Sequence, residues 1–174
     1  MRTISLFGPK GTEGTGRVAL VDDEDYDLVM QYRWNVYEKI RTGTRSNGPY
    51  AQAPVYLEDG RQTSVRMHKL ITGWPMTDHI DGNGLNNQRS NLRPANQSQQ
   101  SMNRRSFVGA SSRYKGVSQR RPGAWTASIQ VNGKQTWLGT FDDELTAALV
   151  RDAAARQLHG EYAYLNFPDG HKGM

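Results

Sequence analysis

The 174-residue chain contains no cysteine. Disulfides, thiolate zinc sites and cysteine nucleophiles are therefore excluded, and the absence suits a reducing compartment. No apolar run approaches the roughly 20 residues of a membrane-spanning helix, so we expect no membrane partner. The N-terminal residues reach Gly8-Pro9 without the apolar stretch of a signal peptide. Together these absences predict a cytoplasmic protein.

Acidic residues are absent from one long part of the chain. Between Gly82 and Phe141 the sequence has no Asp or Glu but nine Lys and Arg, whereas residues 1–60 have nine acids and seven bases. The whole chain has a net charge of +5. Unopposed positive segments favour polyanions, because neutralising phosphates releases counterions. We expect double-stranded DNA as the partner, and the alternative is a solvated basic surface without a specific ligand.

Only 36% of the residues are hydrophobic, which favours small modules over one thick core. Residues 17–21 are typical of a strand, and residues 23–32 of a helix that Asp22 caps. Further strands are expected at 34–37 and 50–57, with a hairpin turn at 58–60 and a short helix ending before Pro75. The segment 78–103 indicates strand, irregular loop, strand and helix. The predicted fold class is therefore α+β.

The C-terminal third indicates a second set of elements. Strands are predicted at 114–120, 125–131 and 135–139, with turns at 121–123 and at Asn132-Gly133, which is a strong hairpin signal. A helix is predicted from a cap at 142–144 to about His159, where Gly160 stops it. The residues expected on its buried face are Leu145, Ala148, Ala155 and Leu158. Asp152 falls in the same row, so it requires an Arg or backbone partner.

The segment from Asp78 to Arg93 contains an Asp-His pair, a Gly/Asn loop and an Asn-Leu-Arg sequence. Asp78 could bind a hard cation while His79, on the opposite face of the same strand, deprotonates water. An imidazole with an ordinary pKa near ~6.5 suits this role at neutral pH. Asn91, on the paired strand, could orient the ring. These residues predict metal-dependent hydrolysis of phosphodiester bonds.

This block resembles the HNH, or ββα-metal, endonucleases of the phage and intron-encoded homing type. The segments that carry the resemblance are His68–Ile71, Asp78–Asn83, Asn86-Asn87, Asn91–Arg93 and the helix at 98–104. The resemblance implies a DNA endonuclease of a bacterial or phage-infected host cytosol that uses one divalent cation, Mg²⁺ by preference and Mn²⁺ as the alternative. It also implies that Asp78 is a metal ligand, that His79 is the general base and that Asn91 orients it.

The sequence departs from that family at Gln100, where the family usually has a His or Asn as the second metal ligand. The amide oxygen of Gln100 stands on one more methylene, and we expect it to serve as that ligand. A weakened site is the alternative, and the chain would then be a DNA-binding regulator with a decayed nuclease site. Structural roles are expected for the remaining polar residues: His68 in packing, Asp81, Asn83 and Asn87 in loop turns, His159 at a helix end and His171 in the tail.

Residues 113–168 resemble the ethylene-response-factor, or APETALA-like, type of DNA-binding domain. The segments that carry this resemblance are Tyr114–Val117, Trp125–Ile129, Trp137–Phe141, the Ala-rich helix, His159-Gly160 and Asn166–Pro168. It implies a three-stranded antiparallel sheet packed on one helix, with the sheet in the major groove. The predicted DNA-binding residues are Arg104, Arg105, Arg113, Lys115, Ser118, Arg120, Arg121, Trp125, Gln130, Lys134, Gln135 and Trp137. For Trp125 and Trp137, packing under the helix is the alternative, because the strand parity is uncertain by one residue.

The predicted organisation has five segments. They are an N-terminal α+β scaffold of the nuclease at 1–60, an HNH nuclease core at 61–106, a linker at 107–112, the DNA-binding domain at 113–168 and a tail at 169–174. The predicted function is a monomeric homing-type endonuclease that the C-terminal sheet targets to its DNA. An RNA-binding protein is disfavoured, because the sequence has no evident stacking platform.

Overall fold

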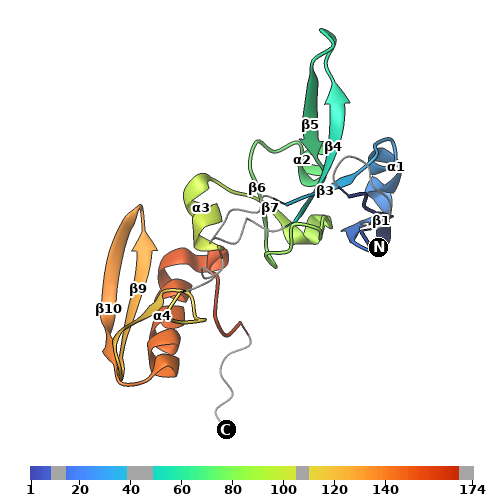
Figure 1. Ribbon diagram of the computed structural model, residues 1–174. Helices are drawn as coiled ribbons and strands as arrows, with labels where there is room; N and C mark the ends of the chain where they lie inside the picture. Colours follow the sequence, from blue (N-terminus) through green and yellow to red (C-terminus); the bar gives the residue numbers. More distant parts are fainter. Residues whose placement is uncertain (9–14, 39–48, 105–109, 169–174) are drawn as a thin grey trace. The chain divides into compact units, whose positions relative to one another are not determined.

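The computed structural model describes residues 1–8, 15–38, 49–104 and 110–168 (Figure 1). The chain divides into two compact units, one containing the described residues up to Asn96 and the other those from Gln97 onward. Strands and helices occur in both units, which confirms the α+β class. The finer assignment of a ββα-metal fold stays a prediction, as do the five predicted segments.

The first unit contains two small sheets and a three-stranded sheet. Strands β1 (Arg2–Ser5) and β2 (Val18–Val21) form an antiparallel pair, as do β6 (Thr77–His79) and β7 (Leu92–Pro94). The antiparallel sheet in the order β3-β4-β5 is built from Asn35–Tyr37, Tyr50–Tyr56 and Gln62–Arg66. The helical segments are η2 (Asp23–Asp25), α1 (Tyr26–Val29), α2 (Met67–Thr72) and η3 (Arg89–Asn91).

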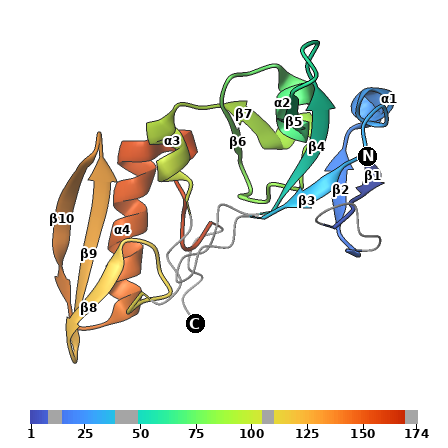
Figure 2. The same ribbon diagram turned by 45° about the horizontal axis from the view of Figure 1, so that its top comes forward.

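The core of the first unit lies under one face of the three-stranded sheet. Alternation along β4 buries Ala51 and Ala53, whose side chains point to the face opposite Gln52. Trp34 is 1% exposed, and its indole N–H donates to the Val29 carbonyl at 2.7 Å, so the buried polar atom is satisfied. Beyond this core, the β4–β5 hairpin projects from the unit (Figures 1 and 2).

The predicted helix at 23–32 is wrong in its length and in its cap. The segment forms a 3₁₀ turn, Asp23–Asp25, followed by a four-residue α-helix, Tyr26–Val29. The Asp22 carboxylate makes no cap hydrogen bond and instead accepts from the backbone N–H of Arg89 at 2.7 Å and from Gln88 Nε2 at 3.1 Å. Contacts with residues far along the chain therefore replace the local cap.

The second unit contains the predicted sheet and helix. Strands β8 (Val117–Arg121), β9 (Ala124–Val131) and β10 (Lys134–Phe141) are antiparallel in the order β10-β9-β8. Helix α4 (Glu144–His159) lies along this sheet in both views, and α3 (Gln97–Met102) and η4 (Gly160–Tyr162) complete the unit (Figures 1 and 2). A three-stranded antiparallel sheet packed on one helix is therefore confirmed.

Small side chains allow α4 to approach the sheet closely. Ala148 and Ala155 are fully buried as predicted, and so is Ala147, which was not on the predicted face. Leu145 is half-buried, and the prediction is wrong for Leu158, which is 49% exposed. The helix begins where predicted, because the Asp143 carboxylate accepts from the Thr146 N–H at 2.7 Å.

Candidate nucleic-acid interface

Alternation along β9 separates two faces of the C-terminal sheet. Ala127 and Ile129 are buried on the side of α4, which places Ser128 and Gln130 on the opposite face. The strand register sets Gln130 beside Gln135 and Ser128 beside Trp137, and Ser118 beside Thr126 continues this face on β8. We call it the outer sheet face, consisting of Ser118, Ser128, Gln130, Gln135 and Trp137.

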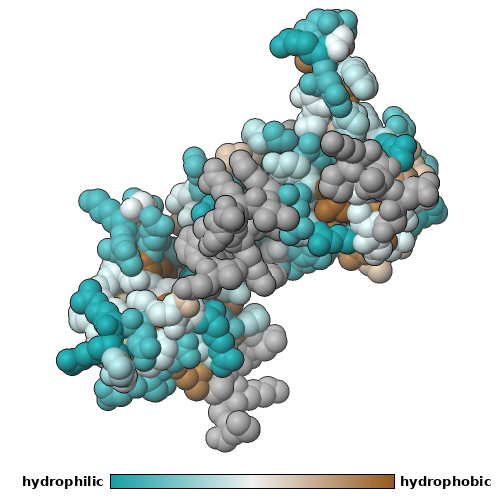
Figure 3. Space-filling model, viewed as in Figure 1, coloured by the Kyte–Doolittle hydropathy of each residue, from teal (hydrophilic) through white to brown (hydrophobic). Residues whose placement is uncertain are grey.

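The outer sheet face is polar, and cations flank it. Gln135 Nε2 donates to Ser128 Oγ at 2.9 Å, which ties β10 to β9 through side chains. Arg120, Arg121 and Lys134 are exposed, and the strands and turns from Val117 to Phe141 contain no acid. Hydrophilic and near-neutral side chains cover most of the visible surface of this unit (Figure 3). This part of the chain therefore offers hydrogen-bonding groups in a positive field.

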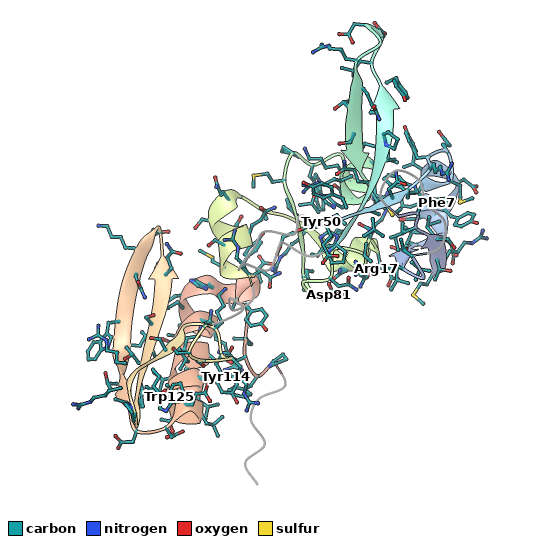
Figure 4. The ribbon with its side chains drawn as sticks, in the orientation of Figure 1. Phe7, Arg17, Tyr50, Asp81, Tyr114 and Trp125 are labelled. Atoms are coloured by element: carbon teal, nitrogen blue, oxygen red, sulfur yellow. The ribbon has the colours of Figure 1, made fainter. Side chains whose placement is uncertain are left out.

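The two tryptophans of the sheet have different environments. Trp137 is 66% exposed on the outer sheet face. Trp125, labelled in Figure 4, is half-buried and packs against the cluster formed with Val117 and Ala148. Strand parity thus supports a surface role for Trp137 and the packing alternative for Trp125.

Most of the other predicted DNA-binding residues are accessible, but Lys115 is not free to reach a ligand. Its ammonium group donates to the carbonyls of Ser101 and Met102 at the end of α3 and lies 5.5 Å from the centre of the Tyr164 ring. Burial, with repulsion from nearby arginines, lowers the pKa of Lys115 to about 7. The structure places this lysine in an internal contact rather than on the outer sheet face.

The basic residues before β8 have varied positions. Arg104 is exposed after α3, and the Arg113 guanidinium donates to the Tyr114 hydroxyl at 2.9 Å. Arg105 lies outside the described residues, as does His171 of the tail. The assignment of Arg104, Arg105 and Arg113 to DNA contacts stays a prediction.

A buried polar network holds the chain segment after α4 against the helix. Asp152 is fully buried and accepts hydrogen bonds from Arg151 Nη1 at 3.2 Å, Asn166 Nδ2 at 3.0 Å and the Phe167 N–H at 2.9 Å. The expectation of an Arg or backbone partner for Asp152 is confirmed. Arg151 is itself 1% exposed and donates to the Tyr164 carbonyl, so the two buried charges are both partnered.

The predicted catalytic block belongs to the first unit, where Asp78 is engaged in a buried ion pair. Its Oδ2 accepts from Arg93 Nε at 3.0 Å and from Arg93 Nη2 at 2.7 Å, and the two residues are direct partners in the β6–β7 register. The side chains are about one-tenth exposed (10% and 9%). A guanidinium therefore already compensates the carboxylate that was predicted to bind a cation.

His79 lies in a buried cluster of rings. Its ring centre is 5.0 Å from that of His68 and 5.8 Å from that of Tyr50, which Figure 4 labels. Burial lowers the pKa of His79, against the opposing effects of Asn87 and of the carboxylates of Asp81 and Asp78. His68 has the predicted packing role, and its own pKa is lowered to about 3, chiefly by burial.

Asn91 shapes the loop that follows His79. Its side chain accepts from the Asp81 N–H at 3.0 Å and donates to Asp81 Oδ1 at 3.0 Å and to the Asn86 carbonyl at 2.8 Å. The side chain of Asn87, fully buried, places its oxygen 3.3 Å from His79 Nε2. Sequence reasoning missed this contact of Asn87, which the spacing of eight residues does not reveal. The turn roles of Asp81 and Asn83 are confirmed, because each accepts from a backbone N–H two residues on.

The two predicted metal ligands belong to different elements of the chain. Gln100 is in α3 of the second unit, whereas Asp78 is in the first. No group of three or more His, Asp or Glu in the described part of the chain is placed to hold a metal ion. The divalent cation, Mg²⁺ or Mn²⁺, stays a prediction.

Comparison with known proteins identifies relatives over about a third of the chain. Sixty-two residues are 52% identical to dehydration-responsive element-binding protein 2D of Arabidopsis thaliana, covering 34% of this chain and 30% of that protein. Fifty-eight residues are 48% identical to dehydration-responsive element-binding protein 1E of Oryza sativa subsp. indica, covering 32% and 26%. An AP2/ERF and B3 domain-containing protein of Oryza sativa subsp. japonica is 48% identical over 58 residues, covering 33% and 16%.

The chain thus spans less than a third of the length of these curated relatives. About 60 of its residues are similar to AP2/ERF-type proteins, which supports the resemblance to the ethylene-response-factor type of domain. No family model matches the chain.

These relatives contradict the prediction that the chain is an enzyme. Two of them are named as element-binding proteins, the third by its domains, and none is named as a nuclease. His79, Asn91 and Asp78 make the contacts described above, and the individual roles predicted for them are not tested by the relatives. The relatives come from plants, so they do not support a bacterial or phage source. In the described residues, no helix has the length and apolar character to cross a membrane.

Proposed function

We propose that this chain is a double-stranded DNA-binding protein whose outer sheet face enters the major groove. The observation that carries the proposal is the exposed, acid-free surface of β8–β10, with Trp137 projecting from it and Arg120 and Lys134 beside it. The relatives named as element-binding proteins support the same function. A DNA-binding role without catalysis is the form of the function that the comparisons favour.

The dimensions and chemistry of the sheet suit the groove. The major groove is about 12 Å wide and admits a narrow β-ribbon. Gln130 and Gln135, paired across β9 and β10, carry amide groups that can recognise adenine, while Arg120 can recognise guanine. Lys134 in the connecting turn suits a phosphate, and Trp137 can pack on a sugar.

The residues of the outer sheet face also predict which bases it prefers. Ser118 and Gln130 are neutral, and members of the resembled family often have Arg at these two positions. Because Arg makes the commonest specific contact with guanine, we expect a target with fewer guanine contacts and more adenine contacts.

The experiment begins by selecting duplexes from a random pool with the full chain. Affinities of the wild-type protein, Gln135→Ala and Trp137→Ala for the selected duplex are then compared by fluorescence anisotropy. Loss of the Gln135 base contact should weaken binding roughly 5- to 150-fold, and loss of the Trp137 packing should weaken it measurably as well. Leu158→Ala is the matched control, because Leu158 is equally an exposed large side chain, but on α4. Equal affinities for all four proteins, or no selected duplex, would refute the proposal.

A further inference from the structure

A basic cavity lies on the first unit, on the face of the β3-β4-β5 sheet opposite its core. It has a volume of about 350 Å³ and is lined by Tyr37, Gln52, Ser64, Arg66 and Lys69. Gln52 pairs with Arg66 in the register, and alternation places Ser64 on the same face as Arg66. Ser64 and Lys69 are exposed and Gln52 and Arg66 are half-buried, so this part of the face is open to solvent.

The two cations of the basic cavity differ from most other described arginines of the first unit. Arg2, Arg17, Arg61, Arg89 and Arg93 each pair with a carboxylate. Within the described residues, neither Arg66 nor Lys69 has a carboxylate within ion-pair distance. Their charges are therefore available to an external anion.

The cavity holds Arg66 in a defined position. Its guanidinium carbon lies 4.9 Å from the centre of the Tyr50 ring and 5.8 Å from that of Tyr37. Such stacking orients the planar donor group before a ligand arrives. Lys69 is exposed on α2, and the positive charges of Arg66 and Lys69 both contribute to lowering the pKa of the neighbouring His68.

The lining indicates a phosphate rather than an apolar ligand. Small-molecule pockets are mostly apolar with few polar groups, whereas this cavity presents two cations, an amide and two hydroxyls. Arg and Lys are the usual donors to phosphate oxygens, and Tyr37 is 37% exposed beside them. We propose that the basic cavity binds a backbone phosphate of nucleic acid, which gives the first unit a DNA contact of its own. This inference rests on the proposed function, because duplex DNA is the ligand in both.

The salt dependence of DNA binding tests the inference. Anisotropy titrations of the full chain on a 30-base-pair duplex, at several NaCl concentrations, give the slope of log K against log salt. Each phosphate contact contributes about 0.9 to that slope. We expect the double variant Arg66→Gln/Lys69→Gln to reduce its magnitude by about 1, and each single variant to reduce it by part of that amount, because both cations contact the same phosphate. Lys69→Gln decides the test if Arg66→Gln is not folded by circular dichroism, because Lys69 is exposed.

Arg61→Gln is the matched control. Arg61 is an exposed guanidinium next to β5 whose charge is already paired with Asp59, so its loss should leave the slope nearly unchanged. A slope that Lys69→Gln lowers no more than Arg61→Gln does would overturn the inference. The inference would also be overturned if inorganic phosphate or polyglutamate, at equal charge, displaced the labelled duplex as well as unlabelled duplex DNA does. If the wild-type chain binds no DNA, both proposals fail; if Trp137→Ala weakens binding while the cavity variants keep the full slope, this one fails alone.

Discussion

Replacing Asp152 by Asn tests the buried network that holds the C-terminal unit together. The substitution keeps the shape of the side chain but removes the negative charge and converts one acceptor into a donor. Asp152 accepts three hydrogen bonds, so the new amide must face at least one donor from Arg151, Asn166 or Phe167. Arg151, 1% exposed, would also lose its carboxylate partner. Breaking a buried ion pair on one side costs about 3–5 kcal/mol, and we expect a loss of this size.

Hydrogen exchange of the α4 amides measures this loss within the second unit alone. A destabilisation of 3–5 kcal/mol should accelerate exchange at Ala148 and Ala155 by roughly 10²- to 10⁴-fold. Asp142→Asn makes the same chemical change at an exposed position before the helix, and we expect it to alter stability by less than about 0.5 kcal/mol. Equal exchange rates in the two variants would refute the argument that Asp152 anchors the segment after α4.

Three further variants test other parts of the account. The pKa of His68 is lowered from 6.5 to about 3, chiefly by burial. Between these two pH values the unfolded chain binds more protons than the folded one, so the first unit should lose stability as the pH falls from 6.5 towards 3. His68→Gln should reduce the pH dependence of the unfolding free energy, measured by urea titration, by up to about 1.4 kcal/mol per pH unit. The same pH dependence in His68→Gln and the wild-type protein would contradict this role of His68. Gly84→Ala would put a Cβ 2.6 Å from the Pro49 carbonyl oxygen, so we expect a loss of at least about 1 kcal/mol and a lower Tm; an unaltered Tm would contradict that contact. Asp143→Ala removes the hydrogen bond to the Thr146 N–H and should cost about 1 kcal/mol, seen as faster exchange in the first turn of α4 and absent in Asp143→Asn.

The C-terminal elements were predictable because local signals agree there. Asn132-Gly133 adopts the tight turn, with Asn132 at φ 49° and Gly133 at φ 79°, and Asp143 caps the helix. Asp152 could be recognised as needing a partner, because it falls in a row of buried alanines. Periodicity and capping are properties of neighbouring residues, so the sequence contains them directly.

Contacts between distant residues could not be predicted in the same way. Lys115 was expected on the DNA, but carbonyls at the end of α3 hold its ammonium group. Asp22 was expected to cap a helix, but residues more than 60 positions away occupy its carboxylate. The faces of Trp125 and Trp137 could not be assigned either, because a bulge between Trp137 and Gly139 shifts the register of β10 against β9. No local sequence pattern encodes that shift.

The catalytic hypothesis depended on one short motif. Asp78 has Arg93 opposite it in the β6–β7 ladder, a pairing that depends on the strand register. The order of the motif predicts the strands and turns of this region, but the relatives contradict the enzymatic activity.

Titrating the labelled full chain with a selected duplex, and following its amide and indole NMR signals, tests the central claim most directly. Binding through the outer sheet face predicts large shifts for the Trp137 indole and for the side-chain amides of Gln130 and Gln135, with the exposed surface of α4 around Leu158 unaffected. Shifts confined to α4, with the Trp137 indole unmoved at saturation, would contradict the claim that the sheet contacts the DNA.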